Sequence, residues 1–161
     1  MDELTHQPAA LVPTRLGSLR VETCGSGPPA VLWHSLFADS STWDRVRRPL
    51  AAARRLLLID GPAHGGSPPV PRAFTLAECA GAAADVLDRL GIDEPADWVG
   101  NAWGGHVGIT FASAYPARCR SLARLTPTTV SVWNFNDRKP RSTDKRRLTS
   151  NPPRSTAHRF A

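Results

Sequence analysis

One short stretch in the second half of the chain has the spacing of a turn built for nucleophilic chemistry. An apolar segment ends at Gly100, and Asn101, Ala102 and Trp103 separate it from Gly104. Gly-x-x-x-Gly between a strand and a helix is typical of a nucleophile elbow, a strained turn that lifts its middle residue above a sheet. Glycine suits both ends because the two backbones approach too closely there for side chains. The middle residue here is Ala102, whose methyl group cannot attack a substrate.

Four apolar segments of strand length are placed to support this turn. Residues 30–33 are a short, continuous apolar run, as expected for a parallel strand buried on both faces, and residues 55–60 and 96–100 predict two further buried strands. Residues 121–126 predict a fourth parallel strand, which ends at Pro127. The sequence therefore predicts an α/β fold in which helices flank a mostly parallel sheet.

Three helices are expected around these strands. Residues 75–90 have apolar residues at helical spacing, with a Thr75–Glu78 capping box at the start and Gly91 at the end. A helix through residue 53 should begin with Ser40 or Ser41 as its cap. The elbow leads into a third helix, residues 107–115.

The helix that ends at residue 53 has two further features. Trp43, Val46 and Leu50 are expected on one apolar face. Pro49 lies inside the helix and is expected to shorten or kink it.

The two ends of the chain differ from its middle. Residues 1–14 are polar and contain proline, which predicts a flexible leader, and residues 15–24 predict a strand or hairpin arm. Residues 131–161 have few apolar residues and the only lysines, which predicts a disordered basic tail. The expected organisation is a leader (1–14), a partial α/β domain (15–130) and a tail (131–161).

With its supporting strands, the elbow resembles that of the α/β-hydrolase family, whose pattern is Gly-Asn-Ser-Trp/Met-Gly-Gly. The resemblance covers residues 15–130 and ends after the elbow half, with Ala102 in place of the nucleophilic serine. It implies an ancestral serine-type hydrolase of small organic esters or carbon–carbon bonds. It also implies an acid and a catalytic histidine beyond the fourth strand, where no strand pattern presents Asp137, Asp144 or His158.

The first buried strand is followed by His34-Ser35-Leu36, where the family has His-Gly-x. The resemblance implies that the backbone N–H groups of Leu36 and Trp103 form an oxyanion hole. Such donors stabilise the negative charge that develops on a substrate oxygen. His34 is expected to hold this loop through hydrogen bonds, without a catalytic role.

Two more residues and one more loop belong to the candidate site. Asn101 and His106 lie near the elbow, and His106 is expected to have a structural packing role. Residues 60–67 look like the family's Asp-x-x-Gly-x-Gly-x-Ser loop, with Ala63 at the first glycine, and the resemblance implies that this loop braces the floor of the site. Neither a phosphate-binding motif nor a cofactor or metal site is predicted.

Charge and cysteine content restrict the functional classes. Residues 1–130 carry 12 Arg, no Lys and 12 acidic residues, so the net charge of +6 belongs to the tail. Three cysteines without CxxC spacing are expected to be free, buried thiols in the cytoplasm. No apolar run is long enough to cross a membrane, and no signal peptide is predicted.

Three functions remain open at this point. The first is an α/β hydrolase that is inactive because its nucleophile, acid and base are missing, and the second is a non-catalytic module that binds a small molecule. The third is a basic tail that binds nucleic acid or an anionic surface, although the tail lacks interleaved aromatic residues and a reader fold. The chain is also expected to be unstable or to self-associate, because the fourth strand would be an exposed sheet edge.

Overall fold

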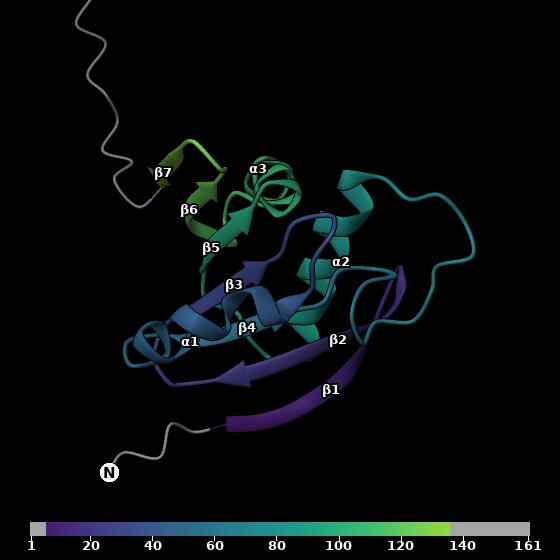
Figure 1. The fold of residues 1–161 in the computed structure, drawn as a ribbon, viewed down its shortest axis with the longest axis horizontal. Coiled ribbons are helices and arrows are strands. Elements are labelled where there is room, and N and C mark those ends of the chain that lie inside the picture. Colours follow the sequence, from purple (N-terminus) through teal and green to yellow (C-terminus); the bar gives the residue numbers. More distant parts are fainter. Residues whose placement is uncertain (1–5, 136–161) are drawn as a thin grey trace, which may run out of the picture.

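The computed structural model describes residues 6–135, apart from the side chain of His6. A single seven-stranded sheet runs through the molecule in the order β1-β2-β4-β3-β5-β6-β7 (Figure 1). The four central strands are parallel, and β1, β2 and β7 join them in antiparallel pairing. The predicted α/β class with a mostly parallel central sheet is confirmed.

The central strands lie close to their predicted positions. They are β3 (Pro29–Trp33), β4 (Arg55–Ile59), β5 (Ala96–Asn101) and β6 (Cys119–Leu125). All five residues of β3 are buried, which explains why it has no polar alternation.

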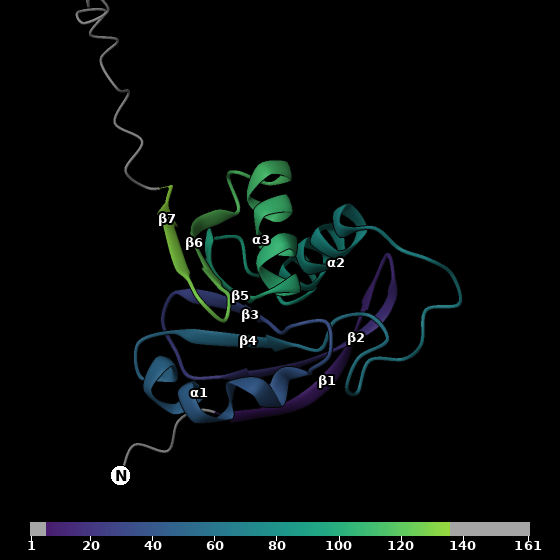
Figure 2. The ribbon, with the colours of Figure 1, turned by 45° about the horizontal axis from the view of Figure 1, so that its top comes forward.

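Helices cover the two faces of the sheet unequally. Helices α2 (Leu76–Arg89) and α3 (Trp103–Ala114) pack together on one face and enclose the larger apolar core. The 3₁₀ helix η1 (Ser40–Trp43) and α1 (Asp44–Ala51) lie on the opposite face, over a smaller core (Figure 2). None of the helices between residues 6 and 135 has the length and apolarity needed to span a membrane.

The helix predictions are correct for α2 and need correction for the other two. Thr75 and Glu78 form the predicted capping box of α2. Asp39, not Ser40 or Ser41, caps the start of η1, because its carboxylate accepts the Ser41 N–H.

Helix α3 begins at Trp103, four residues before its predicted start, because the elbow leads into it directly.

The expected apolar face of α1 is also only partly correct. Trp43 is buried, whereas Val46 and Leu50 are exposed. Pro49 lies inside α1, which ends two residues later at Ala51.

The predicted boundary at residue 14, between a flexible leader and the α/β domain, is wrong. Residues 6–14 form strand β1 (His6–Thr14), which pairs with β2 (Gly17–Cys24) as a hairpin, so the leader is not a loose segment from residue 6 onward. Pro8 and Pro13 are tolerated because β1 is at the edge of the sheet.

The predicted boundary at residue 130, between the α/β domain and the basic tail, also needs correction. Residues 130–134 form strand β7 (Val130–Asn134), which pairs with β6, so β7 and not β6 is the edge strand of the sheet among residues 6–135. Residues 136–161 lie outside the described residues, and the basic tail, Asp137, Asp144 and His158 lie there with them.

The three cysteines are free and buried, as predicted. Burial raises the pKa of Cys79 and of Cys119 to about 12. Both thiols are therefore protonated and unreactive near neutral pH.

The amino end of β5 is anchored by Asp97. Its carboxylate accepts hydrogen bonds from Arg54 (2.8 Å), Arg120 (2.9 Å) and Ser121 (2.6 Å). Burial opposes ionisation of Asp97, but these donors outweigh it and lower its pKa to about 2.

We predict that Asp97 makes stability depend on pH in strongly acidic solution. Because its pKa is lower in the folded chain than in the unfolded chain, its contribution is complete above about pH 4 and is lost between about pH 4 and pH 2. This contribution is about 2 kcal/mol. Urea unfolding at several pH values should show that Asp97→Asn lowers the free energy of unfolding at neutral pH and flattens this acid slope. An unchanged slope would contradict the assignment.

Candidate functional site

The elbow has the backbone geometry expected of a nucleophile turn. Ala102 joins β5 to α3 with φ 47° and ψ −104°, a left-handed conformation that is rare for a residue other than glycine. Its N–H donates to the Leu125 carbonyl oxygen at 2.8 Å, and its own carbonyl oxygen accepts the N–H groups of Gly105 and His106. The strained turn is therefore held from both sides.

Gly104 explains the second glycine of the motif. Its N–H donates to the His34 carbonyl oxygen at 3.1 Å, and a Cβ at this position would overlap the Trp33 carbonyl. A side chain would push α3 away from the end of β3. The same bond brings the loop after β3 against the elbow.

His34 holds its loop through hydrogen bonds, as the sequence predicts. The side chain is fully buried, and its Nε2 accepts the Gly61 N–H at 2.8 Å. Nδ1 therefore carries the proton and donates to the Ser35 carbonyl oxygen at 2.7 Å. Burial lowers the pKa of His34. The ring is a neutral structural link between β3 and the loop after β4.

His64 is part of the site, although the sequence analysis did not single it out. Its ring nitrogens lie 2.8 Å from the Pro62 carbonyl oxygen and 2.6 Å from the Leu36 carbonyl oxygen. Its ring also packs against His34 and Trp103, with centroids 5.0 and 5.2 Å away. The signal in the sequence was topological: the carboxyl ends of neighbouring parallel strands meet at one edge, so the loops after β3 and β4 must lie together.

The two expected oxyanion donors lie on segments that these contacts join. Leu36 is on the loop held by His34 and His64, and Trp103 is the first residue of α3. Among the described residues, no hydrogen-bond acceptor is found for the backbone N–H of either residue. The Leu36 and Phe37 side chains are both exposed.

The other predicted site residues are Asn101, Ser35 and His106, which are half-buried or exposed. Asn101 is the last residue of β5 and is half-buried, as is Ser35. His106 is exposed on α3, so the expectation that it packs into the core is wrong.

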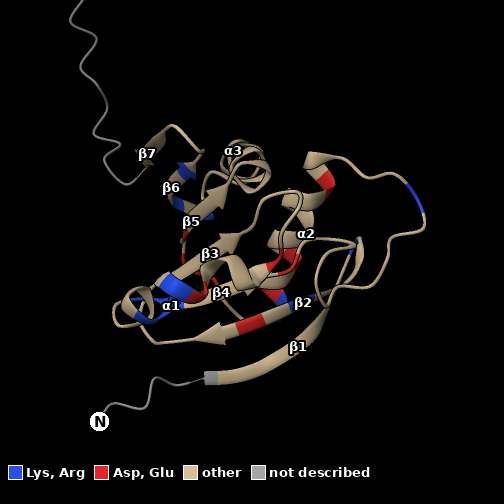
Figure 3. Cartoon of the chain, viewed as in Figure 1, with Lys and Arg blue, Asp and Glu red and all other residues tan. Residues whose placement is uncertain are grey.

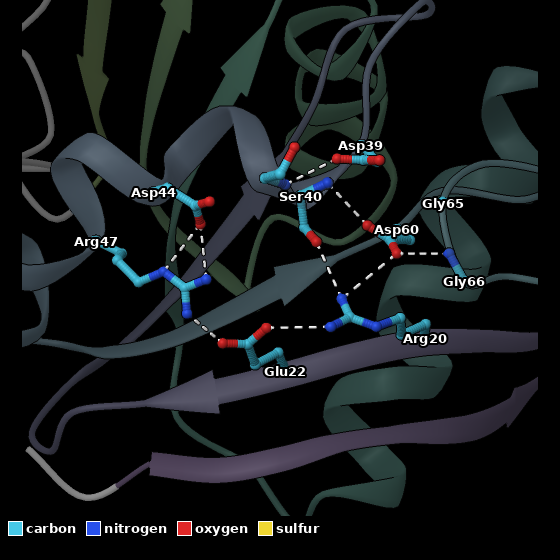
Figure 4. A pocket seen from close by; sticks show the side chains of 10 residues that line it. Arg20, Glu22, Asp39, Ser40, Asp44, Arg47, Asp60, Gly65 and Gly66 are labelled. Carbon is cyan, nitrogen blue, oxygen red and sulfur yellow. Dashed lines mark hydrogen bonds and ion pairs between the residues drawn. The ribbon is translucent and has the colours of Figure 1, made fainter.

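Asp60, the residue after β4, joins three neighbouring segments through its carboxylate. It is almost fully buried and accepts hydrogen bonds from the Ser40 N–H (2.8 Å), the Gly66 N–H (2.9 Å) and Arg20 (3.4 Å), as drawn in Figure 4. Arg20 also pairs with Glu22. The sequence analysis missed this contribution of β2.

Ala63 has φ 62°, which explains why the family pattern has glycine at this position. Among residues 6–135, no three His, Cys, Asp or Glu residues are grouped so that they could hold a metal ion.

Three tryptophans lie behind the elbow. The rings of Trp33 and Trp98 stack with centroids 5.8 Å apart, and Trp103 meets Trp33 edge-on at 5.7 Å. The Trp98 Nε1–H donates to the Gly104 carbonyl oxygen at 3.0 Å. These contacts fix the start of α3 against β3 and β5.

Comparison with known proteins identifies the family. The family model for the alpha/beta hydrolase fold matches residues 28–159. The chain belongs to the α/β-hydrolase family.

Its curated relatives are enzymes. The chain is 39% identical over 125 residues to a pimeloyl-[acyl-carrier protein] methyl ester esterase of Nitrosospira multiformis, covering 74% of this chain and 46% of the relative. It is 40% identical over 103 residues to a 2-hydroxy-6-oxononadienedioate/2-hydroxy-6-oxononatrienedioate hydrolase of Cupriavidus pinatubonensis, covering 63% of this chain and 33% of that hydrolase. The chain thus spans less than half the length of these relatives.

Solved structures show the same fold. A naproxen esterase of Bacillus subtilis has a TM-score of 0.68 and 26% identity, over 74% of this chain and 42% of the esterase. A thermophilic esterase of Thermogutta terrifontis has a TM-score of 0.67 and 25% identity, over 73% of this chain and 45% of that enzyme.

We predict that the elbow conformation stores strain that glycine would relieve. Ala102→Gly should leave stability unchanged or raise it by up to about 1 kcal/mol, because relief of a strained φ offsets the added chain entropy. Ala112→Gly, inside α3, is the matched control and should lower stability by about 1 kcal/mol. Chemical denaturation measures both, and equal losses for the two variants would show that Ala102 is unstrained.

We also predict a pH effect of His34 that is separate from that of Asp97. Since burial lowers its pKa in the folded chain, the unfolded chain binds this proton more readily, and stability falls as the pH drops below about 6.5. His34→Gln should remove this slope, because an amide keeps one donor and one acceptor without titrating. Melting temperatures between neutral pH and about pH 5 test this prediction. A slope that persists in His34→Gln would assign it to another group.

Proposed function

We propose that this chain is a catalytically inactive α/β hydrolase that keeps the carbonyl-binding part of the site. The observation that carries the proposal is the strained turn at Ala102: the backbone of a nucleophile elbow is present, and a methyl group occupies the nucleophile's position. Strain of this kind costs about 1–3 kcal/mol and is characteristic of functional sites.

The chemistry of ester cleavage explains the proposed inactivity. A serine hydroxyl must attack the carbonyl carbon while a histidine takes its proton, and an acid orients that histidine. Ala102 offers no lone pair. His34 cannot act as the base, because both of its ring nitrogens are already bound within the fold.

Binding without cleavage is a second candidate function, and the two backbone donors support it. The N–H groups of Leu36 and Trp103 have no acceptor among residues 6–135, and a substrate carbonyl oxygen would supply one. Loss of the nucleophile leaves backbone donors intact. The ligand we propose is a small organic ester or an oxo acid, because the relatives include a methyl ester esterase and a 2-hydroxy-6-oxononadienedioate/2-hydroxy-6-oxononatrienedioate hydrolase.

We propose the cytoplasm as the compartment, because three free, buried cysteines suit a reducing environment.

We predict that restoring the nucleophile alone restores little activity. The unchanged chain should hydrolyse p-nitrophenyl butyrate at the background rate, and Ala102→Ser should gain less than about tenfold, because one triad member without its base contributes little. The release of p-nitrophenolate measures both rates. Ala112→Ser, on the same helix, is the control for non-specific effects.

Either of two results would overturn the proposal of inactivity. One is turnover by the unchanged chain above the rate in buffer without protein, and the other is a gain of more than about a hundredfold in Ala102→Ser. The second result would require a base elsewhere in the chain.

A further inference from the structure

The two edges of the sheet are protected very differently. At one edge, β1 carries Pro8 and Pro13, which lack the N–H that a pairing strand needs. At the other edge, β7 has the sequence Val-Ser-Val-Trp-Asn, with no proline and no charge (Figure 3). Proline and charge are two of the devices that keep natural edge strands apart, and β7 has neither.

The backbone of β7 presents hydrogen-bonding groups to this open edge. Thr126 and Thr129 exchange N–H···O bonds next to the turn, and Phe135 donates to the Arg120 carbonyl oxygen at 2.8 Å beyond the strand. Hydrogen-bonded pairs alternate along an antiparallel ladder, so Ser131 bonds to β6. The N–H and C=O groups of Val130 and Val132 therefore point away from β6, toward the open edge.

The side chains of these two valines extend an apolar sheet face to the edge. Val130 and Val132 are 65% and 67% exposed, and they lie in register with Leu125 and Ala123 of β6. Ala123 is in turn in register with Val99 of β5. Val99, Ala123 and Val132 therefore form an apolar row across β5, β6 and β7.

The sheet face that carries Val130 and Val132 also has a cavity beside α1. The cavity has a volume of about 370 Å³, with apolar residues of the sheet and of α1 in its lining. Its lining includes Leu32, Leu50, Val99 and Ala123. The apolar row of β5, β6 and β7 thus continues from this cavity to the edge strand.

We propose that β7 pairs with β7 of a second copy of this chain. The two strands run antiparallel about a twofold axis through Ser131, so that Val130 of each copy faces Val132 of the other. Two such pairs form four N–H···O bonds from the outward groups of the valines. The pairing joins the two seven-stranded sheets into one and continues the apolar row across the junction.

A second copy fits this edge better than an unrelated strand for two reasons. A twofold axis brings each residue near its own counterpart, so any charge on β7 would meet a like charge, and β7 has none. The Ser131-centred register also pairs valine with valine, whereas a register centred on Val132 would pair Val130 with the polar Asn134. Five-residue strands bury little area, so we expect a weak dimer with Kd on the order of micromolar.

Sedimentation velocity of the full chain over about a hundredfold concentration range tests the dimer. We expect a reversible monomer–dimer equilibrium that Val132→Lys abolishes. Leu11→Lys is the matched control, because Leu11 is 56% exposed on the opposite edge strand, and it should leave the dimer unchanged. A monomer at every concentration would overturn the proposal, as would equal effects of the two substitutions. Assemblies larger than a dimer that Leu11→Lys dissolves would show β1-to-β7 pairing instead.

Cysteine cross-linking tests the register and does not depend on Val132→Lys being folded. Facing residues in a non-hydrogen-bonded antiparallel pair have Cα atoms about 4.5 Å apart, within disulfide range. Ser131→Cys should therefore form a disulfide-linked dimer under mild oxidation with oxidised glutathione. Thr129→Cys should not, because its counterpart lies about four residues, or roughly 13 Å, along the pair. Equal cross-linking of both variants, or of neither, would overturn the Ser131-centred pairing.

Discussion

The approach of Gly104 to the end of β3 is the contact on which the rest of the site depends. The Gly104 N–H reaches the His34 carbonyl oxygen, its carbonyl oxygen accepts the Trp98 indole N–H, and no room remains for a Cβ. Through this contact the first turn of α3 is fixed against two strands at once. None of these interactions involves the side chain of residue 102, so the elbow keeps its shape with alanine in place. Strain in one residue is offset by packing around its neighbours.

In such a site, different groups would bind a substrate and react with it. The groups that would hold a carbonyl oxygen belong to the backbone at Leu36 and Trp103, and their placement follows from strand ends, a buried histidine and the Gly104 contact. The groups that would react are side chains, each of which a single substitution can remove. The family can therefore lose chemistry at one position while the fold and the backbone donors persist. In our proposal, Ala102 is such a position.

Local patterns were enough to predict the centre of the molecule and failed at its edges. Strand β3 is a short apolar run, β4 and β5 have apolar centres, and Thr75 with Glu78 marks the start of α2, so each of these elements could be predicted from neighbouring residues. Strand β1 was missed because Pro8 and Pro13 are typical of a loop, and only a position at the sheet edge accommodates them. Strand β7 was missed because its exposed valines become a strand by pairing with β6, a contact that no local period encodes.

The site residues also divide into those that local sequence predicts and those that depend on contacts between distant segments. The elbow was found from glycine spacing, and the bonding role of His34 followed from its place after a buried strand. The contribution of His64 was missed because it depends on two strand ends meeting in space, although each loop was recognised separately. The Arg20 contact with Asp60 crosses from β2 to β4 and has no signature in sequence.

The tryptophan cluster gives this chain an intrinsic optical probe of the elbow. Trp33, Trp98 and Trp103 account for three of its five indoles, and the ring of Trp33 lies against those of the other two, next to the elbow. At such separations the excited states of the indoles couple, so the near-UV circular dichroism depends on the mutual orientation of these rings. An intrinsic chromophore is thus built into the turn itself, and its spectrum reports the arrangement of the site without any label.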